Sequence, residues 1–193
     1  MKSAHPPFPD ELVPMEDLSF ELGKHREVSL QRFHVEFNSS GEPIQFAPDR
    51  TWSAKPLVTL EKQTLFAEMA LLTLFRKAGW EGVWADSVHR KYFDKMPNQS
   101  KGVSLTTYIG QVLTRIAEGN GQSRSGCWDL VLWSNKTLVF VAASATHLQG
   151  GVGDARARWL DSALRTGISP GQFVVVEWDY RTVVVKRKRR PAV

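Results

Sequence analysis

Hydrophobic and polar residues follow two patterns along this chain. In some segments hydrophobic residues recur at every second position, as in strands, and in others they recur every three or four positions, as in helices. Between residues 27 and 37, phenylalanine and valine alternate with polar residues. This two-residue period predicts a strand that returns over 43–47 as a β-hairpin. Residues 1–20 are rich in proline and in acidic side chains, so we expect an irregular arm there.

Apolar residues spaced three and four positions apart predict three helices, over 59–78, 104–119 and 154–165. Thr59 and Ser104 are the expected N-caps of the first two helices. Between and after these helices, short apolar runs bounded by turn residues predict strands. The expected strands cover residues 82–88, 128–133, 137–143, 173–178 and 182–185.

This order of elements predicts an α/β fold, in which helices flank a mixed central β-sheet. We expect the centre of the sheet to contain the strands at 128–133, 137–143 and 173–178. The predicted division is an N-terminal arm and hairpin extension at 1–50, the α/β domain at 51–185 and a basic C-terminal tail at 186–193.

Composition agrees with a folded domain, because 42% of the 193 residues are hydrophobic and 23% are charged. The single cysteine, Cys127, excludes an internal disulfide framework and a multi-cysteine zinc site. The first residues lack the apolar core of a signal peptide, and no apolar run is long enough for a membrane helix. We therefore expect a soluble protein with no membrane partner, located in the cytoplasm, or in the nucleus of a eukaryotic cell.

The net charge of +5 is confined to one place in the sequence. Without the C-terminal run of five basic residues, the chain has 20 basic and 20 acidic residues, so the rest of the chain has no net charge. Such a run can contact phosphates, act as a nuclear address or keep the protein in solution, and the sequence leaves these open. The run consists of Lys186, Arg187, Lys188, Arg189 and Arg190.

Three segments, in order, resemble a nuclease family. Residues 126–133 contain W-D-L-V-L-W, residues 138–141 form an apolar strand, and residues 155–160 contain R-W-L. They are similar to the "PD-hydrophobic-W", "hydrophobic-VE-x-K" and "Q-x-x-W-L" motifs of VRR-NUC domains, a branch of the PD-(D/E)XK nuclease superfamily. The resemblance covers residues 126–178, and Glu68 on the first predicted helix extends it. It implies a restriction-endonuclease-like core.

The catalytic side chains of that family are only partly present. Asp129 matches the first acid, although Trp128 stands in place of the usual proline. The second acid falls on Ala142 and the lysine on Ser144, while the helical glutamine falls on Arg156. The family cleaves phosphodiesters with a divalent cation, which polarises the phosphate and activates water. The resemblance therefore implies a nuclease site that has lost two of its three signature side chains.

What remains could supply few metal ligands. Asp129, the backbone carbonyl of Ala143 and Glu68 are the only groups that the resemblance assigns to a metal. Mg²⁺ gives up water reluctantly for so few anionic ligands, so we expect no cofactor, or at most weak Mg²⁺ or Mn²⁺ binding. The resemblance assigns contacts with nucleic acid to Arg156 and Arg158, and the charge pattern adds those of the tail, Lys186, Arg187, Lys188, Arg189 and Arg190.

Three functional hypotheses follow. The first is a catalytically degenerate relative of these nucleases that acts as a nucleic-acid-binding or interaction module. The second is an active Mg²⁺-dependent phosphodiesterase whose catalytic residues have moved, for example to Asp154, Glu118 or Glu177. The third is a protein-interaction domain with no role in nucleic acid, in which the motif similarity arose by chance.

Overall fold

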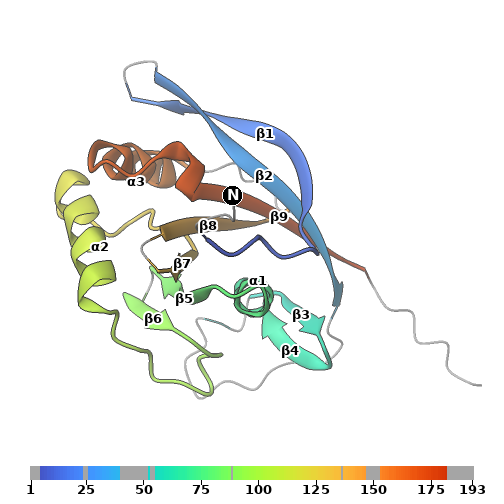
Figure 1. Ribbon diagram of the computed structural model, residues 1–193. Helices are drawn as coiled ribbons and strands as arrows, with labels where there is room; N and C mark the ends of the chain where they lie inside the picture. Colours follow the sequence, from blue (N-terminus) through green and yellow to red (C-terminus); the bar gives the residue numbers. More distant parts are fainter. Residues whose placement is uncertain are drawn as a thin grey trace, which may run out of the picture.

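The computed structural model is a mixed α/β structure, in which one central sheet carries helices on both faces (Figure 1). No helix in the described part of the chain is long and apolar enough to cross a membrane. The structure describes residues 5–23, 26–39, 52, 55–87, 89–135, 137–146 and 153–181.

Nine strands of the described residues form the sheet, in the order β4-β3-β2-β9-β8-β7-β5-β6, with β1 paired to β2. The pairs β2–β9 and β8–β9 are parallel and the others are antiparallel. The strands are β1 (Val13–Leu22), β2 (Arg26–Ser39), β3 (Leu57–Leu60), β4 (Gln63–Phe66), β5 (Glu81–Asp86), β6 (Lys91–Phe93), β7 (Leu130–Ser134), β8 (Thr137–Ala145) and β9 (Phe173–Arg181). The helices are α1 (Ala67–Lys77), α2 (Thr107–Gly119), α3 (Asp154–Arg165) and the short 3₁₀ helix η2 (Pro170–Gln172).

The strands expected at the centre of the sheet lie there. β7, β8 and β9 are neighbours, and each agrees with its predicted range to within three residues at either end. β9 continues to Arg181, while the predicted strand at 182–185 and the basic tail lie outside the described residues. The parallel pairing of β2 with β9 also makes the predicted N-terminal extension a part of the same sheet.

The prediction of an irregular arm is wrong for residues 13–20, which belong to β1. This strand pairs antiparallel with β2, and Pro14 lies opposite Phe33. Most of β1 is exposed, and an edge strand tolerates proline because the missing N–H faces no partner strand. The acidic residues that suggested an irregular arm point into solvent. The predicted hairpin partner at 43–47 lies outside the described residues.

The prediction of a helix from Thr59 is also wrong in its first part. Residues 57–66 form the β3–β4 hairpin, and α1 begins only at Ala67. Glu61 and Lys62 connect the two strands with positive φ angles of 48° and 67°, the conformation of a tight two-residue hairpin turn. The later two helices agree with prediction, although Thr106 rather than Ser104 caps α2, by accepting a hydrogen bond from the N–H of Ile109.

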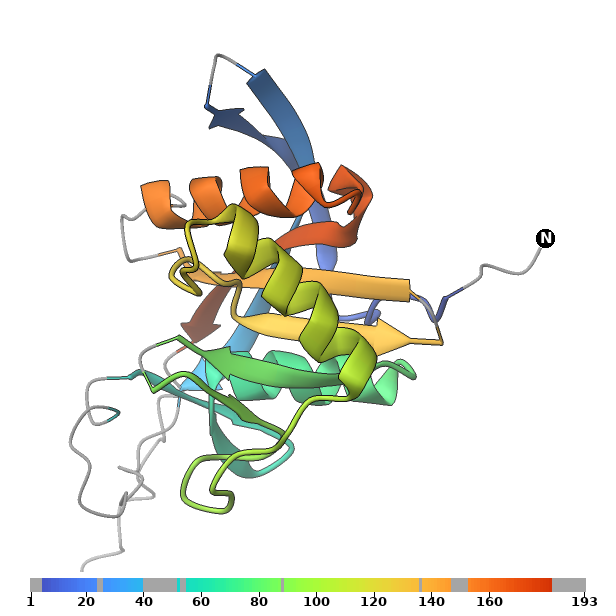
Figure 2. The same cartoon turned by 90° about the vertical axis from the view of Figure 1, so that its left-hand side faces the viewer.

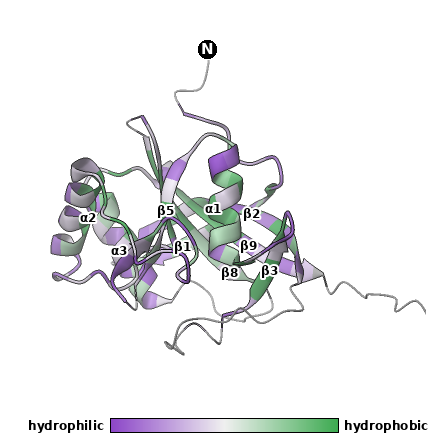
Figure 3. Cartoon of the chain, turned by 90° about the horizontal axis from the view of Figure 1, so that it is seen from below, coloured by the Kyte–Doolittle hydropathy of each residue, from purple (hydrophilic) through white to green (hydrophobic). Residues whose placement is uncertain are grey.

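The two faces of the sheet are covered by different helices. α1 packs on one face, and α2 and α3 lie together on the other (Figure 2). Along β8, Val139 and Val141 face the α1 side while Phe140 and Ala142 face the α2 and α3 side. A strand buried on both faces needs apolar residues at every position. Hydrophobic residues accordingly gather in the inner strands and in α1 (Figure 3).

Candidate functional site

Asp129 lies where β7 begins, and both its backbone and its carboxylate are fixed by neighbouring strands. Its C=O accepts a hydrogen bond from the Ala85 N–H of β5 at 2.8 Å. The β7–β8 ladder stops at the pair of Leu130 and Val141. Beyond that pair the Asp129 carboxylate replaces the missing backbone, because its Oδ2 accepts the Ala143 N–H at 2.8 Å.

Arg156, in the first turn of α3, holds the same carboxylate from the helical side. Its Nη2 donates to Oδ1 of Asp129 at 2.9 Å and to Oδ2 at 2.7 Å. The Asp129 side chain is 17% exposed and that of Arg156 is 27% exposed. Hydrogen bonds between charged groups that are mostly shielded from water are among the stronger hydrogen bonds in proteins. The arginine at the family's glutamine position therefore neutralises the first acid of the motif.

Glu68 approaches the site from α1, on the other face of the sheet. Its carboxylate forms an ion pair with the ammonium of Lys55. That ammonium also lies 4.9 Å from the ring centroid of Trp84 and 5.6 Å from that of Phe66, where the electron-rich ring faces attract a cation. Each of the two acids thus has a cation of its own.

The electrostatics place the two acids in one site. Burial raises the pKa of the Asp129 carboxyl, and the negative charge of Glu68 raises it further. The Arg156 guanidinium, the Ala143 N–H and the Lys55 ammonium act in the opposite direction and favour the ionised form. The structure therefore brings together the first strand acid, the helix acid and the arginine, which the sequence placed in distant segments.

The positions expected for the second acid and the lysine lie on the α3 side of the sheet. Ala142 is completely buried there, and Ser144 shares its face because side chains alternate along a strand. Ser144 pairs in register with Glu177 of β9. Neither side chain can supply a charged group to Asp129.

The donor groups do not fit a divalent metal ion. The Asp129 oxygens are already engaged by Arg156 and the Ala143 N–H, and Glu68 is engaged by Lys55. In the part of the chain that the structure describes, no three His, Cys, Asp or Glu side chains converge as a metal site. A hard cation such as Mg²⁺ needs several oxygen ligands that are free to bind it, and we assign no reaction step to a metal here.

The three acids considered as replacements lie on three different elements, β9, α3 and α2. Glu177 forms a 3.5 Å ion pair with Arg32 of β2. Asp154 is exposed at the start of α3, and Glu118 is exposed near the end of α2. Glu68 is the carboxylate whose charge raises the pKa of Asp129. Of the basic residues assigned to nucleic acid, Arg158 is exposed on α3, while those of the tail lie outside the described residues.

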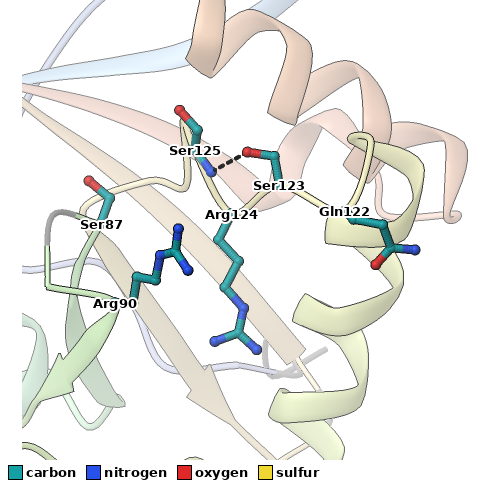
Figure 4. A pocket seen from close by; sticks show the side chains of 6 residues that line it. All are labelled: Ser87, Arg90, Gln122, Ser123, Arg124 and Ser125. Carbon is teal, nitrogen blue, oxygen red and sulfur yellow. Dashed lines mark hydrogen bonds between the residues drawn. The ribbon is translucent and has the colours of Figure 1, made fainter.

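Sequence reasoning missed a polar pocket of about 450 Å³ at the same end of the sheet. The loop after β5 and the loop before β7 form it, and two arginines, Arg90 and Arg124, extend into it (Figure 4). The mixture of basic and aromatic residues at 89–93 is a sequence signal that could have indicated a groove here, whereas the residues at 122–126 are typical of a connecting loop.

Comparisons with protein-family models, with curated proteins and with solved structures gave no match.

Proposed function

We propose that this chain is a catalytically degenerate PD-(D/E)XK domain of the VRR-NUC type, with a restriction-endonuclease-like core, that binds nucleic acid without cleaving it. The observation that carries the proposal is the pairing of Arg156 with both carboxylate oxygens of Asp129. Arg156 is at the helix position of the motif and Asp129 is at its first strand position, and the two side chains form an ion pair. If the two short segments resembled the motif only by chance, there would be no reason to expect this contact.

The same pairing supports the loss of catalysis. A guanidinium supplies a fixed positive charge beside Asp129, but it has no free coordination position and cannot activate water as a metal does. Ala142 and Ser144 lack the second carboxylate and the cation for the phosphate. Loss of a single electrostatic donor costs a factor on the order of 10²–10³ in rate, so the combined losses place hydrolysis near the uncatalysed background.

Charge supports a nucleic-acid partner. Lys55 and Arg156 are paired with Glu68 and Asp129, whereas Arg124 is exposed and lies close enough to Cys127 to lower the pKa of its thiol. Arg158 is exposed on the same helix as Arg156, and the excess positive charge of the chain lies in the tail at 186–190. Basic side chains that replace counterions on phosphates give binding that weakens as salt is added.

The test of binding is the anisotropy of labelled single-stranded, duplex and branched DNA, titrated between about 50 and 200 mM salt. We expect affinity to fall steeply with salt, and the slope to flatten when glutamine replaces the five basic residues at 186–190. The variant Lys62→Gln with Arg115→Gln is the control, because it removes two exposed positive charges that lie outside the pocket and the tail, in the β3–β4 turn and on α2. If the affinity for DNA does not change with salt or with the substitutions in the tail, a protein partner would be favoured instead.

The test of catalysis is a cleavage assay on the same DNA substrates with Mg²⁺ and with Mn²⁺. We expect the unmodified chain to give no cleavage above that of a buffer control. One observation favours an active alternative, namely the position of Glu177 beside Ser144 on the adjacent strand. Robust cleavage that disappears in both Asp129→Ala and Glu177→Gln would establish that alternative and overturn the degenerate site.

A further inference from the structure

The polar pocket formed by the loop after β5 and the loop before β7 has the features of a site that binds an anion through its oxygen atoms. Its lining consists of polar side chains from two loops, without an aliphatic or aromatic residue among them. Figure 4 shows Arg90 and Arg124 extending from these loops into one space. The lining residues are Ser87, Arg90, Gln122, Ser123, Arg124 and Ser125.

The two arginines are available to a ligand. Neither guanidinium forms a hydrogen bond or ion pair with any residue in the described ranges, and both residues are exposed. The carboxylates nearest in the chain are engaged elsewhere, since Asp86 binds the ring of His89 and Asp129 binds Arg156. Asp86 also lines a small adjoining cavity with both arginines, and its carboxylate is engaged by the ring of His89. The two guanidinium groups in the pocket repel each other, and an anion bound between them reduces that repulsion.

The loop that carries Arg124 is held in shape by its own hydrogen bonds. The side-chain amide of Asn120 donates to the carbonyls of Ser123 and Ser125 at 2.9 and 3.1 Å. The N–H of Ser125 donates to the Ser123 hydroxyl oxygen at 3.1 Å, which leaves the hydroxyl proton free for a ligand. Gln122 has a φ angle of +62°, a left-handed conformation that non-glycine residues adopt rarely and that often occurs at binding sites. The site is therefore formed before a ligand arrives.

The other loop places its arginine in a comparable way. Arg90 has a φ angle of +55° in the turn between β5 and β6, and this turn directs its side chain toward Arg124 (Figure 4). Ser87, from the same turn, adds a hydroxyl group on that side of the pocket. The two loops thus bring two guanidinium groups into one pocket, whose lining also contains three serines.

This donor set matches one chemical class. Guanidinium groups bind phosphate oxygens with paired N–H donors, and serine hydroxyls donate to the remaining oxygens. A phosphate monoester carries a charge of about −1.5 to −2 at neutral pH, which two arginines balance, whereas a phosphodiester within a strand carries only one charge. We propose that the Arg90–Arg124 pocket binds a phosphate monoester, and that this is the terminal phosphate of a nucleic-acid strand, a choice of source that rests on the function proposed above.

The first experiment tests the pocket without nucleic acid. Phenylglyoxal modifies arginines, and mass spectrometry of peptides from the full chain gives the rate at each one. We expect inorganic phosphate, compared with chloride at equal ionic strength, to slow modification of Arg90 and Arg124 several-fold and to leave Arg115 unchanged. Equal rates at Arg90 and Arg124 in both salts would overturn the phosphate pocket.

The second experiment tests the source of the phosphate. We expect a labelled single strand with a terminal phosphate to bind more tightly than the same strand with hydroxyl ends. In Arg90→Gln with Arg124→Gln, affinity for the phosphorylated strand should fall about tenfold or more, because hydrogen bonds from two charged groups are lost. The magnitude of the slope of the logarithm of the binding constant against the logarithm of the salt concentration should also decrease by about one. The control is Lys62→Gln with Arg115→Gln, in which the preference for the phosphorylated end should remain.

The two experiments separate failure of the pocket from failure of the proposed function. Protection by inorganic phosphate with no binding of any strand would support a phosphate site for small molecules and overturn the nucleic-acid function. Strand binding that is the same with and without a terminal phosphate, and the same in the double variant, would overturn the assignment of the pocket and leave the nucleic-acid function in place.

Discussion

The guanidinium of Arg156 contacts both carboxylate oxygens of Asp129, at 2.9 and 2.7 Å, across the junction between α3 and the start of β7. This contact joins the first turn of a helix to the start of a strand and engages both oxygens of the carboxylate. It therefore has a structural consequence and a chemical one, and each can be measured.

The structural consequence is a coupling free energy between the two side chains. In a double-mutant cycle with Asp129→Asn and Arg156→Met, we expect a coupling of about 1–3 kcal/mol, because both charges are largely shielded from water. Urea denaturation of the four proteins measures it. The exposed pair of Glu61 and Lys77 is the control, and its cycle should give less than about 1 kcal/mol. A coupling for Asp129 and Arg156 no larger than that of the control would contradict the prediction.

The chemical consequence concerns the nuclease ancestry proposed above. The variant Ala142→Glu with Ser144→Lys returns the missing acid and lysine, but Arg156 still occupies Asp129. We expect Mg²⁺-dependent cleavage only when Arg156→Gln is added, since the glutamine frees the carboxylate oxygens for a metal.

Two further proteins serve as controls for the restored site, the triple variant with Asp129→Asn added and the double variant without Arg156→Gln. The same triple variant with Asp129→Asn should be silent, and thermal melts show whether each variant is folded, because Ala142 is completely buried. If the double variant cleaves DNA as fast as the triple variant, Arg156 does not prevent metal binding at Asp129 and the prediction is wrong.

Gly126 is predicted to be the most sensitive glycine of the site. Its φ angle is +81°, and a Cβ atom there would lie 2.0 Å from the carbonyl oxygen of Ala155 at the start of α3. We expect Gly126→Ala to lower the free energy of unfolding by about 2–4 kcal/mol. Gly110, in the middle of α2, has open space around it, so Gly110→Ala should raise stability by about 0.5–1 kcal/mol. Equal effects in thermal or urea denaturation would contradict this assignment.

Cys127 is predicted to be unreactive while the chain is folded. Burial, and then the negative charge of Asp129, raise the pKa of its thiol from 9.0 to about 12. Since the thiolate is the reactive form, alkylation by iodoacetamide at about pH 8 should be about 10²–10³-fold slower in the folded protein than in urea. Mass spectrometry measures the rates, with Cys127→Ser as the unlabelled control. Similar rates in both states would show that the thiol is not shielded.

The same shift determines how stability depends on alkaline pH. Above about pH 9 the unfolded chain loses the Cys127 proton, whereas the folded chain keeps it until about pH 12. The folded state then binds more protons, so the free energy of unfolding falls as pH rises through this window. In Cys127→Ser this part of the decrease should be absent. An identical alkaline profile for the two proteins would contradict the raised pKa.

The sequence predicted those parts of the fold in which the local pattern and the tertiary structure agree. The strands β7, β8 and β9 follow from short apolar runs, and α3 follows from the spacing of its apolar residues. The hairpin at 57–66 did not, because its apolar residues also fit a helical period and only the left-handed pair Glu61 and Lys62 separates the two structures. Local patterns could not reveal the choice of β1 as the partner of β2, since pairing depends on contacts across the sheet.

The candidate site was predictable in its positions but not in its contacts. The motif placed Asp129 and Arg156 in the site, but gave no reason to expect an ion pair between them. The phosphate pocket was missed because Arg90 and Arg124 lie in separate loops, and only the β5–β7 pairing brings these loops together. Side chains from distant loops meet through topology, which a local reading of the sequence does not contain.

The parallel pairing of β2 with β9 has a consequence for biosynthesis. β2 leaves the ribosome early, but the strand that covers its inner edge is the last one of the described chain. Until β9 is synthesised, this edge keeps unpaired backbone groups that can bind another nascent chain. Contacts between such distant segments also slow folding. The growing polypeptide should therefore depend on chaperones until β9 emerges, and truncation before residue 173 should cause aggregation rather than a smaller folded domain.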